Sequence, residues 1–394
     1  MRLAHNAHLA YCTNVHPGKD WEETFRSLEN DVLRVRRNVC PRQPYAIGLR
    51  LSAASAQELS DPRTLLAFRD WLQENDCYVF TINGFPYGNF HNQRVKEQVY
   101  RPDWTTPERL EYTNRLFDIL AQLLPPGVSG SVSTLPGSFK RFIHSSEQSE
   151  AMRQNLYRCF NHIDSLCQTH QLDLHLGLEP EPLGWFENTS ETLSFFDQLV
   201  DGHPDPEQLL QRVGLNYDTC HFALEYEKAA DSLQRLSSNG IRLSKIHLSS
   251  ALKLRTFDKP SLTLIESFRE ETYLHQVLAR SNQSPIVRYE DLPLALEARE
   301  NGRDASEEWR IHFHIPLHAD PELPLESTSD HLLETLDFIS KSPELCQHFE
   351  METYTWAVLP DQLQNKSVVD QVSDEYRWIL SQLDRRGFIS RSPA

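Results

Sequence analysis

Acidic and imidazole side chains end four successive apolar segments in the second half of the chain. They are Glu179 in LGLEPEP, Asp218 in NYDTCH, His247 in KIHLSS and Glu352 in FEMETYT. Carboxylate oxygens and an imidazole nitrogen form a mixed ligand shell that suits Zn, Mn, Co or Mg. Packed together without a cation, four such groups would suffer large desolvation and like-charge penalties. We therefore predict that these residues bind a divalent metal ion.

A second cluster of imidazoles lies later in the chain. His312 and His314 alternate with apolar residues in WRIHFHIP, so they would share one face of a strand. His221 follows Asp218 by three residues, about one helical turn. The three histidines could form a second metal position or hold part of a substrate, and the pattern does not choose between these. One or two metal ions are therefore expected.

Further polar residues lie next to these ligands or end other apolar segments. Glu181 and Glu350 each lie two residues from a predicted metal ligand, and either could transfer a proton. Lys96 and Arg101 occupy an aromatic loop, where they could meet a carboxylate or a phosphate. The predicted substrate-binding residues are Asn14, His16, Arg50, Asn83, Lys96 and Arg101.

Composition and motifs exclude several other classes of protein. The 394 residues carry 39 Lys plus Arg against 56 Asp plus Glu, a net charge of −17 that disfavours nucleic acid as a partner. Phosphate-binding glycine loops and the serine-hydrolase elbow are missing. The seven cysteines form no C-x-x-C pair, and no run approaches the roughly 20 apolar residues of a membrane helix. We expect a cytoplasmic protein with no membrane insertion that binds a small metabolite.

Short apolar segments alternate with amphipathic ones along most of the chain. The strand candidates are residues 8–13, 45–51, 78–82, 128–134, 174–179, 214–218, 243–248 and 348–353. The helix candidates include residues 21–37, 61–74, 107–124, 147–170, 189–200 and 229–239. Eight such repeats predict a closed (β/α)8 TIM barrel, with a doubly wound open sheet as the alternative. In a barrel the strand ends that carry the predicted ligands meet at one mouth.

Two long connections interrupt this alternation. The aromatic loop at residues 83–107, after the third strand, is far longer than an ordinary βα connection, and we predict an ordered lid over a pocket. Residues 249–318 follow the seventh strand and are too polar at 283–291 and 298–308 for a separate core, so we predict an insertion at the barrel mouth. Residues 1–394 are thus expected to form one barrel domain that ends in a helical segment at 357–394.

The ordered motifs LEPEP, DTCH, IHLSS and the Glu-Thr of MET resemble the xylose isomerase-like barrel superfamily, which includes sugar isomerases, epimerases and the endonuclease IV family. The resemblance implies one divalent cation on Glu179, Asp218, His247 and Glu352. The DTCH step is similar to the endonuclease branch, which implies a further zinc on His221 and either His312 or His314. Where that branch has two more histidine ligands, this chain has Asn83 and the Ser133-Thr134 pair, which implies one or two metals rather than three.

Patterns spread over residues 11–356 resemble a narrower group, the metabolite traffic protein EboE family. Among them are YCTNVHPG, FTINGFPYGNFH, VKEQVYRPDWTTPERL and WRIHFHIP. The resemblance implies a role in bacterial ebo gene clusters, which move secondary-metabolite precursors towards the periplasm, with other ebo-cluster proteins as partners. Three activities remain open: a metal-dependent isomerase, epimerase or hydrolase; a carrier without turnover; and an endonuclease IV-like phosphodiesterase, which the acidic charge disfavours.

Overall fold

Eight parallel strands form a barrel at the centre of the computed structural model, which describes residues 1–89, 96–270, 272–281, 285–319, 321–355 and 366–389. They are β1 (His8–Tyr11), β2 (Tyr45–Arg50), β3 (Cys77–Asn83), β4 (Gly130–Thr134), β5 (Leu174–Leu178), β6 (Val213–Asp218), β7 (Leu243–Leu248) and β13 (His348–Met351). Their order is β1-β13-β7-β6-β5-β4-β3-β2, and a parallel bridge from Cys12 to Gly48 joins the two ends. The predicted TIM barrel is therefore confirmed, and each predicted strand matches an observed one to within two residues at either end.

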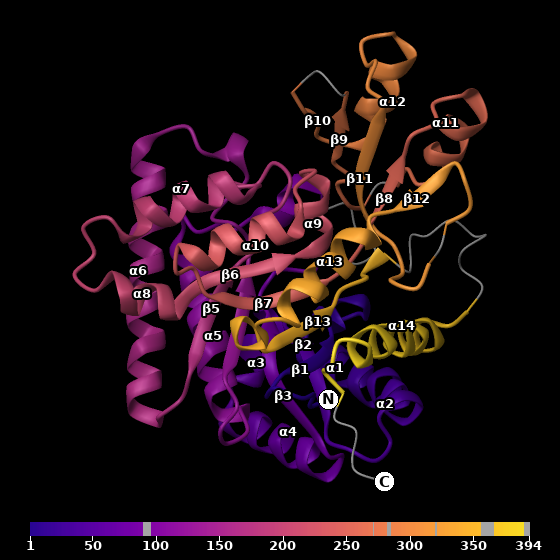
Figure 1. Cartoon of the computed structure of the whole chain (residues 1–394). Helices are drawn as coiled ribbons and strands as arrows, with labels where there is room; N and C mark the ends of the chain where they lie inside the picture. The colour runs from indigo at the N-terminus through magenta and orange to yellow at the C-terminus, as the bar shows by residue number, and fades with distance from the viewer. Residues whose placement is uncertain (90–95, 271, 282–284, 320, 356–365, 390–394) are drawn as a thin grey trace.

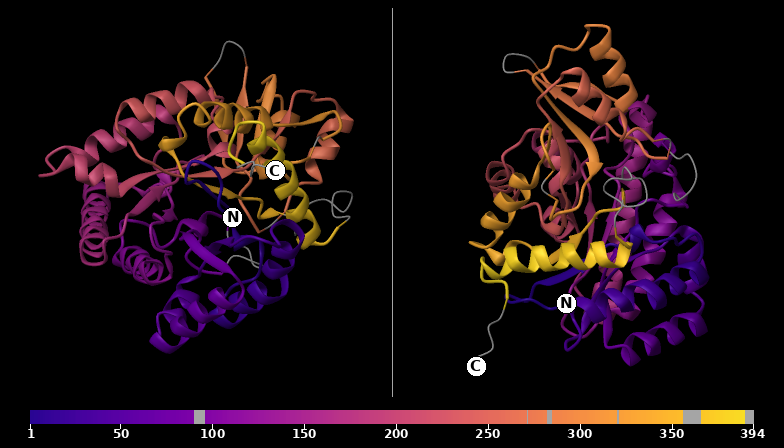
Figure 2. Two further views of the ribbon diagram at one scale, coloured as in Figure 1. Left: turned by 60° about the horizontal axis from the view of Figure 1, so that its bottom comes forward. Right: turned by 90° about the vertical axis from the view of Figure 1, so that its right-hand side faces the viewer.

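Helices surround the barrel, as Figures 1 and 2 show. They are α1 (Trp21–Ser27), α2 (Leu33–Val39), α3 (Ala53–Leu59), α4 (Pro62–Glu74), α5 (Pro107–Leu123), α6 (Ser146–His170), α7 (Thr189–Val200), α8 (Pro206–Arg212), α9 (Thr219–Leu224), α10 (Ala229–Ser238) and α13 (Ser329–Ile339). Side-chain caps fix several starts, among them Asp61 before α4 and Ser145 before α6. The helix predicted at residues 21–37 is instead divided by a π-helical segment, Leu28–Val32. No helix in the described ranges is both long enough and apolar enough to cross a membrane.

The connection after β7 builds a second, antiparallel sheet, which stands at one end of the barrel in Figure 1 and in the right-hand view of Figure 2. Its strands, in the order β10-β9-β11-β8-β12, are β8 (Ala251–Leu254), β9 (Val277–Arg280), β10 (Val287–Tyr289), β11 (Glu308–His314) and β12 (Leu325–Ser327). Two helices, α11 (Lys259–Glu266) and α12 (Leu292–Glu300), complete it.

This insertion has an apolar core of its own, contrary to the sequence prediction. Leu252, Phe268, Trp309 and Phe313 are among its buried members. The apolar residues occupy alternate positions on the strands, so the polar stretches between them lowered the average hydrophobicity on which the prediction rested. The insertion also extends past residue 318, because β12 pairs with β8.

The C-terminal helix α14 (Val368–Asp384) lies beside α2, as Figure 1 shows. Tyr376 on α14 accepts a hydrogen bond from Tyr45 at the start of β2 (3.1 Å), and Ser373 accepts one from Asn38 (3.1 Å). The predicted helical segment at 357–394 is thus helical over α14, while residues 357–365 and 390–394 lie outside the described ranges.

Candidate metal centre

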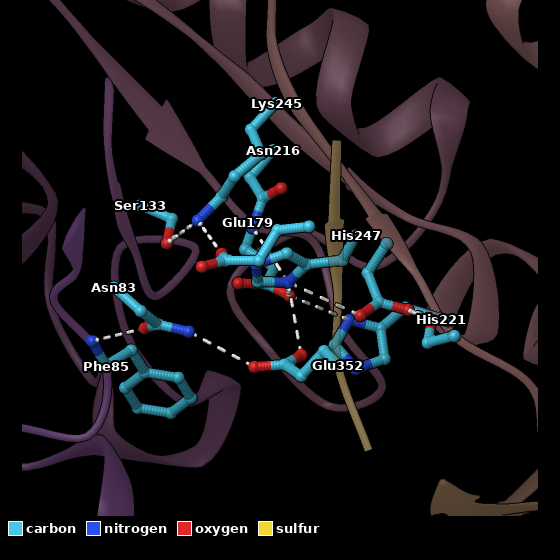
Figure 3. Close-up of polar contacts among 12 residues, drawn as sticks. Asn83, Phe85, Ser133, Glu179, Asn216, His221, Lys245, His247 and Glu352 are labelled. Carbon is cyan, nitrogen blue, oxygen red and sulfur yellow. Dashed lines mark hydrogen bonds and ion pairs between the residues drawn. The ribbon is translucent and has the colours of Figure 1, made fainter. Parts of the chain in front are cut away.

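The four predicted ligands lie together at the C-terminal ends of adjacent strands. Figure 3 shows three of them, Glu179, His247 and Glu352. Glu179 follows β5, Asp218 ends β6, His247 lies on β7 and Glu352 follows β13. Strand register places Asp218 beside His247. All four are buried, and each offers one ligand atom within 4.8 Å of the others. The ligand atoms of a tetrahedral zinc site lie about 3.4 Å apart, so this spacing suits a shared cation.

The imidazole of His247 is held so that one nitrogen faces the carboxylates. Its Nδ1 lies 2.9 Å from Glu179 Oε1, 3.1 Å from Glu352 Oε2 and 3.6 Å from Asp218 Oδ2. Its Nε2 donates a hydrogen bond to Glu350 Oε2 at 2.9 Å. An imidazole that donates its outer N–H to a carboxylate presents its other nitrogen to a metal, which is the usual arrangement around protein-bound zinc.

The electrostatics of these four residues also fit a cation. Burial alone would lower the pKa of His247, but Glu352 and Glu179 outweigh it and raise that pKa well above its ordinary value. Burial would likewise raise the pKa of Asp218, yet His221 and His247 hold it well below its ordinary value. Asp218 Oδ2 is buried without a hydrogen-bond partner. The protein thus supplies anionic oxygens, one of them unsatisfied, around a point that a divalent ion could occupy.

Three histidines form a second cluster beside the first. Each donates its Nδ1–H to a protein oxygen: His221 to Pro180 O at 2.9 Å, His312 to Gln276 Oε1 at 2.7 Å and His314 to Glu352 O at 2.9 Å. Carbonyl oxygens only accept, so these contacts fix the tautomers at His221 and His314. At His312 the amide orientation is set because Gln276 Nε2 donates to Pro182 O at 3.1 Å. All three rings therefore keep an unprotonated Nε2 when neutral.

These free nitrogens meet in a confined space. His221 Nε2 lies 3.0 Å from His312 Nε2, and His314 Nε2 is buried with no hydrogen-bond partner. Burial and the neighbouring His221 lower the pKa of His312 well below its ordinary value, which keeps that ring neutral. Two lone pairs 3.0 Å apart repel each other unless a cation lies between them. Asp218 or Glu181 can complete this site, since each lies within 4.8 Å of two of the histidines.

Local structure explains how the histidines reach this position. A register shift between Ile311 and His314 interrupts the pairing of β11 with β8. Bulges of this kind redirect side chains and are common beside functional sites. Ile311 and Phe313 pack into the insertion core on the opposite face, as the alternation in the sequence predicted. The insertion therefore contributes directly to the candidate metal centre.

A pocket of about 650 Å³, its opening to solvent included, borders both clusters. Glu181, Glu179, Glu352, His221 and His312 line its polar end. Glu181 Oε1 is buried without a hydrogen-bond partner, and burial together with Glu179 raises the pKa of Glu181 well above its ordinary value. A carboxyl group with these properties beside a metal centre can take up and release a proton.

The other predicted proton-transfer residue is Glu350. It is not among the described residues that line this pocket. It is fully buried in the barrel interior, where it pairs with Lys245 at 2.5 Å and accepts from His247. Glu350 thus contacts the predicted metal ligand His247 in place of the pocket, and its part in proton transfer stays a prediction. Gly48 leaves room for it, because a Cβ there would lie 2.0 Å from Glu350 Oε1.

Two predicted substrate-binding residues reach the centre by hydrogen bonds to Glu352. Asn14 donates to Glu352 Oε1 at 2.8 Å and Asn83 donates to the same oxygen at 3.1 Å. Asn14 also lines the pocket, and its Oδ1 is buried and unpaired. These amides orient the Glu352 carboxylate, and Asn14 keeps one acceptor for a ligand.

The charged groups of the three predicted substrate-binding cations lie against protein atoms. Lys96 lines the pocket, but its ammonium already binds Glu270 O at 3.0 Å, Tyr273 O at 2.7 Å and Asp291 Oδ2 at 2.7 Å. Arg50 is buried against backbone carbonyls, including Gly18 O at 2.9 Å. Arg101 is exposed and stacks on Phe142. Substrate contact by these three residues therefore stays a prediction, and their charged groups already have partners within the protein.

The predicted substrate-binding residue His16 contacts the protein instead, because its Nε2 shares a hydrogen bond with the Tyr11 hydroxyl at 2.8 Å.

Sequence reasoning missed Lys245 and Gln276, although the position of each in the sequence could have indicated it. Lys245 lies two residues before His247 and so shares its face of β7. Gln276 lies just before β9, the strand that pairs with β11.

Comparison with known proteins defines the fold. No family model matches the sequence, and no curated protein is significantly similar to it. Among solved structures, an L-ribulose 3-epimerase superposes with a TM-score of 0.51 and 10% identity over 98% of this chain and 96% of the other. A D-allulose 3-epimerase from Methylomonas sp. superposes with a TM-score of 0.51 and 12% identity, over 97% of this chain and 100% of the other. A putative sugar phosphate isomerase/epimerase from Anabaena variabilis superposes with a TM-score of 0.50 and 11% identity, over 97% of this chain and 99% of the other.

These likenesses, together with the closed barrel, show a (β/α)8 barrel fold. At identities this low they show the fold alone, so function must come from the site.

Proposed function

We propose that the protein is a divalent-metal-dependent enzyme of the isomerase or epimerase type that acts on a small metabolite. The observation that carries this proposal is the convergence of Glu179, Asp218, His247 and Glu352 next to the unpaired carboxyl of Glu181. A cation held there would polarise a carbonyl or hydroxyl oxygen of the substrate. The fold that it shares with sugar epimerases supports the same reaction class.

The residues of the chain have distinct tasks in this proposal. Glu181 removes a proton from the carbon beside the substrate carbonyl. A proton then returns in one of two ways: water protonates the same carbon from its other face while Glu181 gives its proton to solvent, or Glu181 protonates the former carbonyl carbon while the proton of the adjacent hydroxyl passes to the former carbonyl oxygen. The first outcome is epimerisation and the second is isomerisation. Asn14 accepts a substrate hydroxyl through its unpaired Oδ1. His221, His312 and His314 hold a second cation, for which the facing Nε2 atoms of His221 and His312 are the specific support.

Solvent deuterium exchange tests this proposal with simple carbonyl compounds as probes. The metal-loaded protein is incubated in D2O with excess L-ribulose or D-allulose, the sugars named for the structural relatives, or with 2-hydroxyacetophenone. Catalysis is expected to place deuterium beside the carbonyl in many substrate molecules per protein, as read by NMR. Stoichiometric binding without exchange would instead favour the alternative, a metal-dependent carrier.

The wider role of the protein is proposed from the resemblance of its motifs to the EboE family. That resemblance supports a cytoplasmic step on a secondary-metabolite precursor before its export to the periplasm, alongside other ebo-cluster proteins. A hydrolase remains a second reaction type on the same metal centre, and release of two products would identify it. Cleavage of abasic DNA is the least favoured activity, because the net charge of −17 opposes a phosphate backbone.

A further inference from the structure

Apolar and aromatic side chains form much of the pocket wall beside the predicted metal ligands. They are Phe85, Val99, Tyr100, Tyr273, Leu274 and Tyr354. The rings form two pairs, with centroids 5.8 Å apart for Phe85 and Tyr100 and 5.3 Å apart for Tyr273 and Tyr354. Walls of this composition bind flat apolar groups, because aromatic rings bury large areas and stack edge to face or offset.

These walls come from three separate segments that are fastened together. Phe85 and Tyr100 belong to the loop after β3, Tyr273 lies in the insertion and Tyr354 follows β13. Lys96 ties the first segment to the second through its ammonium contacts with Glu270 O and Tyr273 O, and its backbone N–H donates to Thr272 O at 3.0 Å. These contacts hold the aromatic wall in place in the protein without a ligand.

Among the described residues that line this pocket, no side chain offers a free positive charge to an anionic substrate. Lys96 is the only lysine or arginine among the lining residues that the structure describes, and its ammonium is surrounded by two carbonyls and the Asp291 carboxylate. Glu179, Glu181 and Glu352 line the polar end. A phosphate or carboxylate placed away from the metal centre would lose its hydration without gaining a partner.

Neutral hydroxyl groups, in contrast, would find a partner in the pocket. Asn14 and Tyr100 both line the pocket. Asn14 Oδ1 is buried without a hydrogen-bond partner, and the Tyr100 hydroxyl interacts with the Glu181 carboxyl group. Unsatisfied buried groups are costly, so a ligand that pairs with them is favoured over one that does not. An unpaired acceptor such as Asn14 Oδ1 suits a hydroxyl group of an uncharged molecule.

We infer that the substrate is an uncharged molecule with two unlike ends: a hydroxyl- or carbonyl-bearing end at the metal centre, and an aromatic ring between the Phe85–Tyr100 and Tyr273–Tyr354 pairs. Free sugars and sugar phosphates would fit this site less well. The inference rests on the proposed function, because it takes the metal centre as the place where the polar end binds.

Two pairs of probes test this inference by calorimetric titration of the metal-loaded protein. The first pair, 2-hydroxyacetophenone and hydroxyacetone, differs by a phenyl ring in place of a methyl group, and the phenyl compound is expected to bind at least about tenfold more tightly. The second pair, dihydroxyacetone and dihydroxyacetone phosphate, tests charge, and the phosphate is expected to give no gain. Equal affinities within the first pair, or tighter binding of the phosphate, would overturn the inference.

A variant of the aromatic wall completes the test. Phe85→Ala is expected to remove most of the phenyl preference while metal content stays unchanged. Phe195→Ala is the matched control, because Phe195 stacks on Phe186 outside the pocket. Melting curves confirm that both variants fold. Failure of the proposed function would appear as absent deuterium exchange, whereas failure of this inference would appear as no phenyl preference in protein that holds its metal.

Discussion

Lys245 Nζ lies 2.5 Å from Glu350 Oε2, and both side chains are completely buried inside the barrel. The same oxygen accepts the Nε2–H of His247 at 2.9 Å. Burial would raise the pKa of Glu350, but Lys245 and His247 lower it, so the carboxylate stays charged. This chain of contacts fixes which nitrogen of His247 faces the other carboxylates.

Removal of the Lys245 charge should therefore destabilise the protein strongly. Lys245→Met leaves Glu350 buried without its cation, and loss of one partner of a buried pair costs about 3–5 kcal/mol. Urea denaturation would measure this change in the free energy of unfolding. The double variant Lys245→Met/Glu350→Gln should recover most of the loss, because no charge is left unpaired. If Lys245→Met alone is as stable as the parent protein, this role of the pair is contradicted.

The two histidine-containing clusters should lose metal independently. His312→Ala is expected to reduce the bound metal by one equivalent and to leave the Glu179, Asp218, His247 and Glu352 site filled. Mass spectrometry of dialysed, metal-loaded protein measures the content, with the surface variant His162→Ala as control, because the His162 side chain hydrogen-bonds Asp118 away from both clusters. Full retention of metal in His312→Ala would show that the facing imidazoles hold no cation.

Asp218→Asn should affect both sites at once. The Asp218 carboxylate lies within ligand distance of His247 on one side and of His221 and His314 on the other. Its Oδ1 is occupied by the backbone N–H groups of Cys220 (2.7 Å) and His221 (3.1 Å), which leaves Oδ2 for a cation. We expect the variant to bind less than half the metal of the parent protein. Loss confined to one site would assign Asp218 to that site alone.

Glu181→Gln separates proton transfer from binding. The amide cannot exchange a proton in the same way, so deuterium incorporation is expected to fall at least about 100-fold. The metal bound by Glu179, Asp218, His247 and Glu352 and the affinity for 2-hydroxyacetophenone should change little, because Glu181 is not one of these four ligands. Undiminished exchange in this variant would remove Glu181 from the proposed mechanism.

Glu375 on α14 predicts a pH dependence of stability. Burial raises its pKa from 4.5 to about 7, although the Leu317 N–H and the Thr353 hydroxyl both donate to it. The folded protein therefore keeps a proton that the unfolded chain loses, and stability falls as pH rises from 4.5 to about 7.

Glu375→Gln should remove this dependence, because the amide oxygen can accept the same two hydrogen bonds without a charge. Stability at pH 8 is expected to rise by up to about 3 kcal/mol relative to the parent protein, with little change at pH 4.5. Urea denaturation at the two pH values measures the difference. If the free energy of unfolding differs between variant and parent by the same amount at both pH values, Glu375 does not titrate in this range.

The sequence was sufficient to predict the barrel and the grouping of the four ligands. Apolar segments separated by amphipathic ones identify the strands, and the C-terminal ends of barrel strands must meet. It could not show which polar groups already have partners. Lys96 and Arg50 resemble anion-binding residues in the sequence, but backbone carbonyls from distant segments surround them in the fold.

The sequence also could not show how far from the barrel mouth each strand residue lies. Glu350 and Glu352 follow the same two-residue period, which predicts both side chains at the mouth. In the structure Glu352 reaches the metal centre, whereas Glu350 lies lower in the barrel beside Lys245. The apolar core of the insertion was missed for a similar reason, because average polarity obscured the alternate burial of residues such as Trp309 and Phe313.

The most direct test of the metal centre is anomalous diffraction from crystals grown with Mn²⁺ or Zn²⁺. We expect an anomalous peak about 2.0–2.3 Å from one oxygen each of Glu179, Asp218 and Glu352 and from Nδ1 of His247. Fully loaded crystals that show no peak among these four side chains, with His247 still bonded to the carboxylates, would contradict the metal centre.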